Sequence, residues 1–239
     1  RPAGFQIQFQ GRPVDLGLSP NGSWMAVLNK NSLELIRVND RTIVQRLPIN
    51  KGGSYNGVAF SDDGKKIYVS QARDRILIAE MGSDNVFTWV DKITFSESKV
   101  GGHPVPGGIV LNEEKGKLYT TLNRNNSLAV VKLSNKSIIE IPVGVAPYEV
   151  TLYSPEKAYV SNWGGRQPKP GEVTYKTSQS DILIDPNTGI ANNGTVSVVD
   201  LIKGKEIKSI EVGLHPTAMV LSPDKKHLYV ACANSDIVS

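Results

Sequence analysis

The sequence predicts an all-β chain, a β-propeller of four-stranded blades, for three reasons. Short runs rich in β-branched and apolar residues alternate with turn residues, the pattern recurs along the chain, and helical periodicity is nowhere convincing. A unit of about 42 residues cannot bury both faces of its own sheet, so such units must stack on one another. Radially stacked sheets form a propeller, which leaves only short edges open. A β-sandwich with accidental internal similarity is the alternative, and five matching units disfavour it.

Five units can be aligned, and each is expected to form one blade. They begin at Pro13, Tyr55, Pro106, Pro147 and Pro216. The first strand ends in a turn such as Ser-Pro-Asn-Gly at 19–22 or Ser-Asp-Asp-Gly at 61–64, whose residues fix φ or cap the backbone. The second strand surrounds a tyrosine, which Met25 replaces in the first unit. Third strands are expected at 75–79, 127–131 and 195–199, and fourth strands at 42–47, 137–141 and 206–212.

The residue motifs of the repeat distinguish between propeller families. No tryptophan precedes an aspartate, as WD40 repeats require, and the paired glycines come before the first strand, where kelch repeats do not have them. The pattern Gly-x-x-Pro, then Ser-Pro-Asp-Gly-Lys, then Tyr-Val-(Thr/Ser/Ala)-Asn resembles the YVTN repeat of bacterial surface-layer and lactonase-like propellers. The quartet at 159–162, Tyr-Val-Ser-Asn, is the closest copy. This resemblance covers almost the whole chain and implies a ring that usually has seven blades.

The number of blades leaves two interpretations open. The fifth unit stops at Ser239 inside its third strand, and Phe5 to Phe9 alternates like a fourth strand ahead of the first unit. This segment would complete the last blade of a five-bladed ring. Alternatively, the chain is part of a seven-bladed ring, which we favour because a mid-strand end leaves backbone groups without partners. Because the chain begins at Arg1 and shows no signal segment, we expect a processed or trimmed polypeptide.

The fourth unit carries about 28 additional residues between its second and third strands, within 163–193. Long loops inside compact repeats are usually functional or disordered, and the aliphatic residues near Ile182 favour an ordered loop over one face of the ring. Asp181, Asp185 and Asn187 have the spacing of calcium ligands, but too few oxygens are present, and Asp-Pro-Asn-Thr-Gly is an ordinary turn sequence. We therefore expect a turn there.

The residues around the insertion resemble a more specific group of proteins. The stretches Ser-Asn-Trp-Gly-Gly-Arg at 161–166 and Gly-Thr-Val-Ser-Val-Val-Asp at 194–200 look like exported bacterial proteins that pair a YVTN propeller with an alkaline-phosphatase-like phosphoesterase domain. The resemblance implies a periplasmic or extracellular location and a covalently linked phosphoesterase domain. It also suggests that Trp163 and Arg166 help to position a ligand. With only three histidines here, the metal-binding set of that domain has no counterpart, so its activity transfers to no residue.

A candidate ligand site comes from the repeat alignment. The first strands should line a central channel, and Arg12, Asp15, Glu149 and His215 occupy positions that would converge at one of its mouths. A carboxylate pair with histidine and arginine suits the binding or hydrolysis of a small anionic ester. A water-filled channel with unspecialised polar walls is the simpler interpretation. A small molecule or protein at this face is the expected partner.

Composition excludes several other classes. The longest apolar run has six residues against about 20 for a membrane span. The +4 charge is spread in pairs beside turns, which does not indicate nucleic-acid binding. A single Cys232 in an apolar string is expected to be an inert buried thiol, and neither metal nor cofactor is predicted. We therefore expect a non-catalytic binding or scaffold module, with a lactonase-like hydrolase as the alternative.

Overall fold

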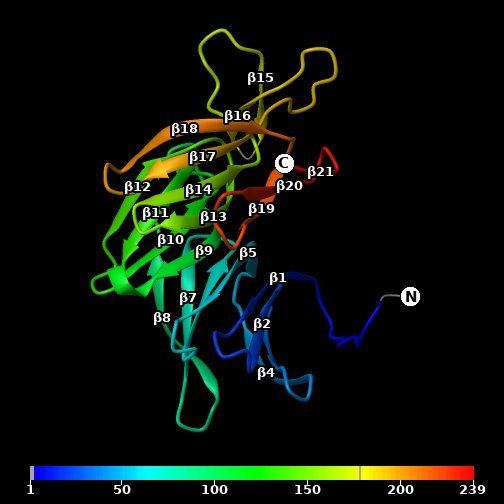
Figure 1. The fold of residues 1–239 in the computed structure, drawn as a ribbon, viewed down its shortest axis with the longest axis vertical. Helices are drawn as coiled ribbons and strands as arrows, with labels where there is room; N and C mark the ends of the chain where they lie inside the picture. The colour runs from blue at the N-terminus through cyan, green and yellow to red at the C-terminus, as the bar shows by residue number, and fades with distance from the viewer. Residues whose placement is uncertain (1–2, 178) are drawn as a thin grey trace.

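The computed structural model describes residues 3–177 and 179–239 and shows five antiparallel sheets stacked side by side around an axis (Figure 1). The first blade comprises β1 (Pro13–Leu18), β2 (Trp24–Asn29), β3 (Ser32–Arg37) and β4 (Thr42–Pro48). The second comprises β5 (Gly53–Phe60), β6 (Lys66–Gln71), β7 (Arg75–Met81) and β8 (Phe87–Thr94). The third comprises β9 (Pro106–Asn112), β10 (Lys117–Leu122), β11 (Ser127–Lys132) and β12 (Ile138–Pro142), with the 3-10 turn η1 (Glu113–Lys115) between β9 and β10.

The fourth blade comprises β13 (Pro147–Ser154), β14 (Lys157–Asn162), β17 (Gly194–Asp200) and β18 (Lys205–Val212). The fifth comprises β19 (Pro216–Leu221), β20 (Leu228–Cys232) and the short β21 (Ile237–Val238). Strands within each blade pair in chain order. This arrangement confirms the predicted β-propeller, and the expected third and fourth strands all lie within one or two residues of the observed ones. No helix in the described part of the chain is long and apolar enough to cross a membrane.

The hydrophobic core lies between neighbouring blades. Leu28 and Leu35 of the first blade pack with Ile67 and Phe87 of the second, and equivalent clusters follow between each later pair. Second and third strands are covered on both faces, whereas fourth strands such as β18 alternate at the outer rim. Burial on two faces favours continuous apolar runs and exposure of one face favours alternation, which explains both sequence patterns.

The turn after the first strand repeats one hydrogen-bonding device. In the second blade the Ser61 hydroxyl donates to Asp63 Oδ1 over 2.6 Å and accepts from the Lys66 backbone N–H over 2.8 Å. Ser19 with Asn21 and Ser222 with Asp224 make the same bonds in the first and fifth blades. These bonds give hydrogen-bond partners to turn residues that do not pair with a neighbouring strand, which confirms the turns predicted there.

The first strands of adjacent blades approach closely because glycine is present there. Gly57 has φ +109°, and a Cβ at this position would overlap the Gly107 carbonyl oxygen and the side chain of Ser70. The Ser70 hydroxyl donates to that same carbonyl over 2.6 Å. Glycine is therefore required for both its backbone conformation and the missing side chain.

The blades form an open arc. Inner strands pack in the order β1, β5, β9, β13 and β19, and no comparable packing joins β19 to β1 in the described part of the chain (Figure 1). Residues 5–9 form no strand, so they do not supply the missing strand of the fifth blade. Instead the Phe5 ring lies under the guanidinium of Arg41, 4.8 Å away, on the first blade. This contact corrects the interpretation in which Phe5 to Phe9 closes a five-bladed ring.

The insertion between β14 and β17 forms its own hairpin. Strands β15 (Thr174–Thr177) and β16 (Ser180–Leu183) pair with each other and project from the fourth blade (Figure 1). The base of the insertion is anchored by Gln167, whose Nε2 donates to the Val143 carbonyl, and by Gly164, which lies against Val145 and Ile182. The insertion is therefore attached where the loops of the third and fourth blades meet.

Candidate functional site at the channel mouth

Three residues in a left-handed backbone conformation shape one end of the arc. Val105, Ala146 and His215 have φ between 52° and 57°, and each precedes the proline that opens its blade. Their carbonyls accept backbone N–H groups from the loop after the second strand, for example Trp163 N–H to Ala146 over 3.0 Å. Non-glycine residues in this region cost about 1–3 kcal/mol each, and such strain concentrates at functional sites. All three line the same pocket.

Four rings from three blades pack together beside these residues. We call Tyr55, Tyr148, Trp163 and His215 the mouth cluster. Trp163 lies between Tyr148, with ring centroids 4.5 Å apart and 22° between planes, and His215, 4.3 Å away. Tyr55 contacts both Tyr148 and Trp163, at 5.9 and 5.3 Å. Offset or tilted aromatic pairs contribute about 0.5–1.5 kcal/mol each, so the cluster holds the three blades in a fixed relation.

The mouth cluster borders two adjoining pockets. The larger, which we call the mouth pocket, has a volume of 410 Å³. It is lined by Tyr55, Val105, Asn123, Arg124, Ala146, Trp163, Gly164, Thr177, Ile182, Ala191, His215 and Asn234. The smaller pocket, of 230 Å³, shares Tyr55 and Val105 and includes Arg12 and Lys30. The insertion contributes Thr177, Ile182 and Ala191, so it walls one side of the site.

The two pockets are cationic. Arg124 lines the larger pocket, Arg12 and Lys30 line the smaller, and no carboxylate among the described residues lines either. None of the three cations forms an ion pair within residues 3–177 and 179–239. Burial lowers the pKa of His215, which keeps its imidazole neutral near pH 7. The site therefore presents aromatic surface and unpaired positive charge together.

The two expected carboxylates lie on the inner strands and are occupied by the fold. Asp15 Oδ2 accepts the backbone N–H groups of Gly57 and Val58, over 2.6 and 3.2 Å, and so joins the first blade to the second. Glu149 accepts from the Val150 N–H and from the Asn56 amide, each over 3.2 Å. Burial, together with a smaller effect of the nearby Asp15 charge, raises the pKa of Glu149 to about 7.

The structure thus separates the six residues expected at the site. Trp163 and His215 line the mouth pocket, and Arg12 lines its neighbour, whereas Asp15 and Glu149 line neither. None of the five main pockets of the described residues is lined by Arg12, Asp15, Glu149 and His215 together. Arg166 forms a bidentate ion pair with Glu172 inside the insertion, with its closest contact at 2.6 Å.

The carboxylates of the insertion serve its own local structure. Asp181 pairs with Lys176 over 2.9 Å across the hairpin, and Asp185 accepts the backbone N–H groups of Asn187 and Thr188. Asp185 therefore stabilises the turn that the Asp-Pro-Asn-Thr-Gly sequence predicts. No group of three or more candidate metal ligands occurs among the described residues.

Sequence reasoning missed Tyr55, Tyr148 and Arg124. Tyr55 stands where the four other blades have proline, and the sequence marks it only as the start of a repeat. The sequence does carry a signal for the rest of the pocket wall. Asn123 and Trp163 each directly follow the four-residue motif that begins with the tyrosine of the second strand. The next positions, Arg124, Gly164 and Asn234, also line the mouth pocket. Comparing the two residues that follow this motif in each blade would have located this side of the mouth pocket.

Comparison with known proteins bears only on the fold. No family model matches the chain, and no curated protein matches its sequence. Among solved structures, Kuenenia stuttgartiensis hydrazine synthase is 16% identical, with a TM-score of 0.66 over 96% of this chain and 58% of its own. The Myceliophteria thermophila Cps50 (Swd1) β-propeller domain is 10% identical, with a TM-score of 0.64 over 93% of this chain and 63% of its own.

A protein of unknown function from Desulfotomaculum acetoxidans is 13% identical, with a TM-score of 0.69 over 97% of this chain and 69% of its own. The chain therefore spans 58% to 69% of the length of these three structures. At such identities the likeness concerns architecture and not activity. Strand pairing, radial stacking and these neighbours agree that the chain has the β-propeller fold.

Proposed function

We propose that this chain is a non-catalytic binding module whose ligand occupies the mouth pocket. The observation that carries the proposal is the packed aromatic cluster beside Arg124 in a 410 Å³ pocket that no described carboxylate lines. Ligand pockets of about 300–1,000 Å³ typically combine apolar walls with a few fixed polar groups. Aromatic walls with an unpaired guanidinium suit a small ligand that carries a planar apolar group and an anionic group.

Binding is favoured over hydrolysis because the groups that hydrolysis needs are not assembled. Asp15 and Glu149 are held by backbone and amide donors on the inner strands, and the mouth pocket contains neither. Turnover of a lactone by the purified chain, abolished in Glu149→Gln, would overturn the non-catalytic assignment.

The proposal is tested by calorimetric titration with 2-naphthoate, phenyl phosphate and the uncharged 2-naphthylmethanol. We expect saturable binding of the anions, weakened about tenfold or more in Arg124→Gln because one charge-assisted hydrogen bond contributes about 1.5–3 kcal/mol. Trp163→Leu should weaken all three compounds. Lys132→Gln, on the outer end of β11, removes the same charge away from the pocket and serves as the control. Equal binding of naphthylmethanol and the anions, or an unaffected Arg124→Gln, would refute the ligand class.

We further propose, from the YVTN resemblance, that the module is an accessory part of an exported bacterial phosphoesterase with a seven-bladed ring. The exposed apolar side chains at both ends of the arc support additional blades. Leu16 and Leu18 of β1 are 59% and 55% exposed, and Val220 and Val238 of the fifth blade 61% and 69%. Blades between these ends bury such residues against their neighbours.

The intact mass of the natural protein tests this wider proposal. A polypeptide containing further blades and a metal-binding catalytic domain would support it. Phosphoester hydrolysis by that protein, with weaker substrate affinity in Trp163→Leu, would then indicate that the mouth pocket positions substrate. A natural protein that has no such domain would overturn the phosphoesterase link without affecting the binding test above.

A further inference from the structure

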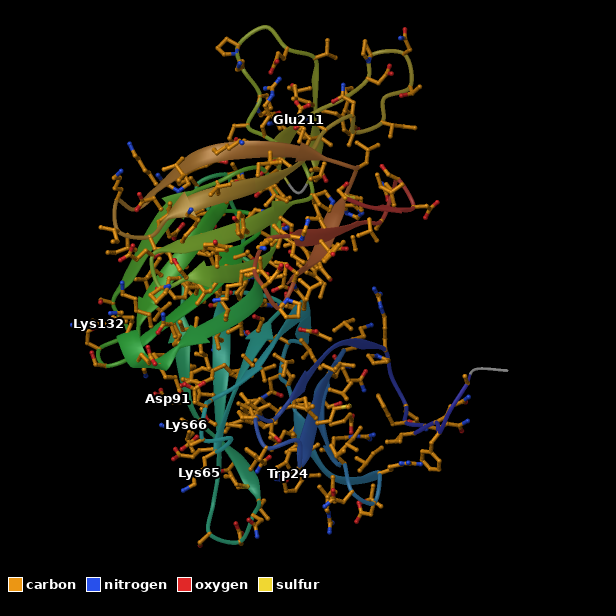
Figure 2. All side chains as sticks on the ribbon, in the orientation of Figure 1. Trp24, Lys65, Lys66, Asp91, Lys132 and Glu211 are labelled. Atoms are coloured by element: carbon orange, nitrogen blue, oxygen red, sulfur yellow. The ribbon has the colours of Figure 1, made fainter. Side chains whose placement is uncertain are left out.

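A groove between the second and third blades lies at the end of the strands opposite the mouth pocket. It has a volume of 710 Å³ and combines the turn before β6, the faces of β7 and β8, and two turns of the third blade. We call this the interblade groove. It is lined by Ser61, Asp62, Asp63, Lys66, Tyr68, Ile78, Glu80, Val90, Asp91, Ile93, Glu113, Leu133 and Lys136. Figure 2 shows Asp91 and Lys66 on this side of the molecule, with Lys132 of the neighbouring blade beyond them.

The groove is acidic in a chain whose net charge is +4. Five carboxylates line it against two lysines, of which Lys136 already pairs with Asp91 over 2.5 Å. Glu80 and Asp62 accept no hydrogen bond on their carboxylates from any described residue. Glu113 accepts only the Asp62 backbone N–H, over 2.9 Å. The groove therefore holds negative charge that the described residues do not neutralise.

Tyr68 adds to the groove a hydroxyl without a partner among the described residues. Its side chain lines the groove from strand β6 and the residue is only 5% exposed, yet its hydroxyl makes no hydrogen bond to any described residue. Burial raises the pKa of Tyr68, and the carboxylates of Glu113, Asp63, Glu80 and Asp91 raise it further. The unpartnered hydroxyl thus lies within the field of four carboxylates on the groove floor. The hydroxyl oxygen itself opens into the groove, so it is free to hydrogen-bond a group that enters there.

We propose that the interblade groove binds an arginine or lysine side chain of a partner polypeptide. Ile78, Val90 and Leu133 offer apolar wall for an aliphatic stem, while Glu80 and Asp62 meet the charged head. A divalent cation fits less well, because no three candidate ligands among the described residues converge on one point and Lys66 stands among the carboxylates. Charge complementarity together with an apolar wall favours a long cationic side chain over a compact ion.

The test uses the whole chain, the peptide Ala-Arg-Ala-Arg-Ala, and the same peptide with citrulline, which keeps the shape and removes the charge. We expect the arginine peptide to shift amide resonances of β6, β7 and η1 in NMR spectra, and the citrulline peptide to bind at least fivefold more weakly. The double variant Asp62→Asn/Glu80→Gln should weaken the arginine peptide three- to tenfold, because two exposed ion pairs contribute up to about 1 kcal/mol each. Neither change removes a hydrogen bond, so folding should be unaffected.

The control variant Glu97→Gln/Glu156→Gln has the same net charge and alters exposed glutamates outside the groove. It should bind the arginine peptide like the natural chain. Equal affinity for arginine and citrulline peptides, equal weakening by both double variants, or shifts confined to other blades would each overturn the proposal. Calcium that produces the same shifts and displaces the peptide at micromolar concentration would also overturn it, in favour of a metal site.

Discussion

Replacing Glu149 by glutamine should change how stability depends on pH. Burial raises the pKa of Glu149 from 4.5 to about 7. Between these values the folded state holds a proton that the unfolded state has released. Because the folded state binds more protons, the free energy of unfolding falls as pH rises through this window and levels off above about pH 7. At 1.36 kcal/mol per pH unit, the total loss from this group is about 3 kcal/mol.

About 2.5 kcal/mol of that loss falls between pH 5 and pH 8, so these two conditions suffice for the measurement. Urea unfolding at both pH values gives the free energy for the natural chain and for Glu149→Gln. Glutamine stays neutral, and its oxygen can still accept the Val150 N–H, but its amide opposes the Asn56 amide. We therefore expect the variant to be less stable than the natural chain at pH 5 and more stable, by about 1–2 kcal/mol, at pH 8.

Glu156→Gln is the matched control, because the Glu156 side chain is exposed and accepts no hydrogen bond from any described residue. Its pH dependence should parallel that of the natural chain. If Glu149→Gln also gave a parallel curve, displaced by a constant amount, the buried carboxylate would already be charged at pH 5. The assignment of an elevated pKa would then be wrong, and with it the inference that burial keeps Glu149 protonated at pH 5.

Three further experiments test the packing, two of them with a matched control substitution. Gly57→Ala should cost several kcal/mol or prevent folding, because its Cβ overlaps Gly107, whereas Gly204→Ala, also at positive φ but in open space, should cost about 1 kcal/mol in thermal unfolding. Arg46→Ala removes the cationic partner, at 2.9 Å, of the fully buried Glu34 carboxylate, which keeps its hydrogen bonds from Ser32 and Asn29, and should cost about 2 kcal/mol. Arg37→Ala, at an exposed pair, should cost under about 1 kcal/mol. Cys232, 2% exposed, should react with a thiol reagent only after urea is added.

The strand framework was predictable because its signals are local. Period-two alternation on fourth strands, continuous apolar runs on second strands and Ser-x-Asp turns each reflect contacts within a few residues or between paired strands. The segment at 5–9 shows the limit of such signals. It alternates like a strand, but alternation does not specify which edge a strand must join, and Phe5 contacts Arg41 instead.

The candidate site was predictable only in part, because it depends on contacts between distant blades. Repeat alignment placed Arg12 and His215 at the mouth, since equivalent positions face the same end of every blade. The same alignment placed Asp15 there too. Nothing in the sequence indicates that its carboxylate instead accepts the backbone N–H of Gly57, which lies 42 residues away. Tyr55 contacts Tyr148 across 93 positions, so the mouth cluster exists only once the arc has formed.

The two proposed sites should bind their ligands independently of each other, and the distance between them can be estimated from the strand that joins them. Tyr55 borders the mouth pocket and Ser61 the interblade groove, at opposite ends of the first strand of the second blade. Six residues of extended chain span about 20 Å, which exceeds the screening length of about 8 Å at physiological salt. Direct electrostatic coupling between an anion at one site and a cation at the other should therefore be negligible. Titrating the arginine peptide with and without saturating 2-naphthoate should give dissociation constants that agree within about twofold. A larger difference would mean that the inner strands transmit a conformational change from one end of the arc to the other.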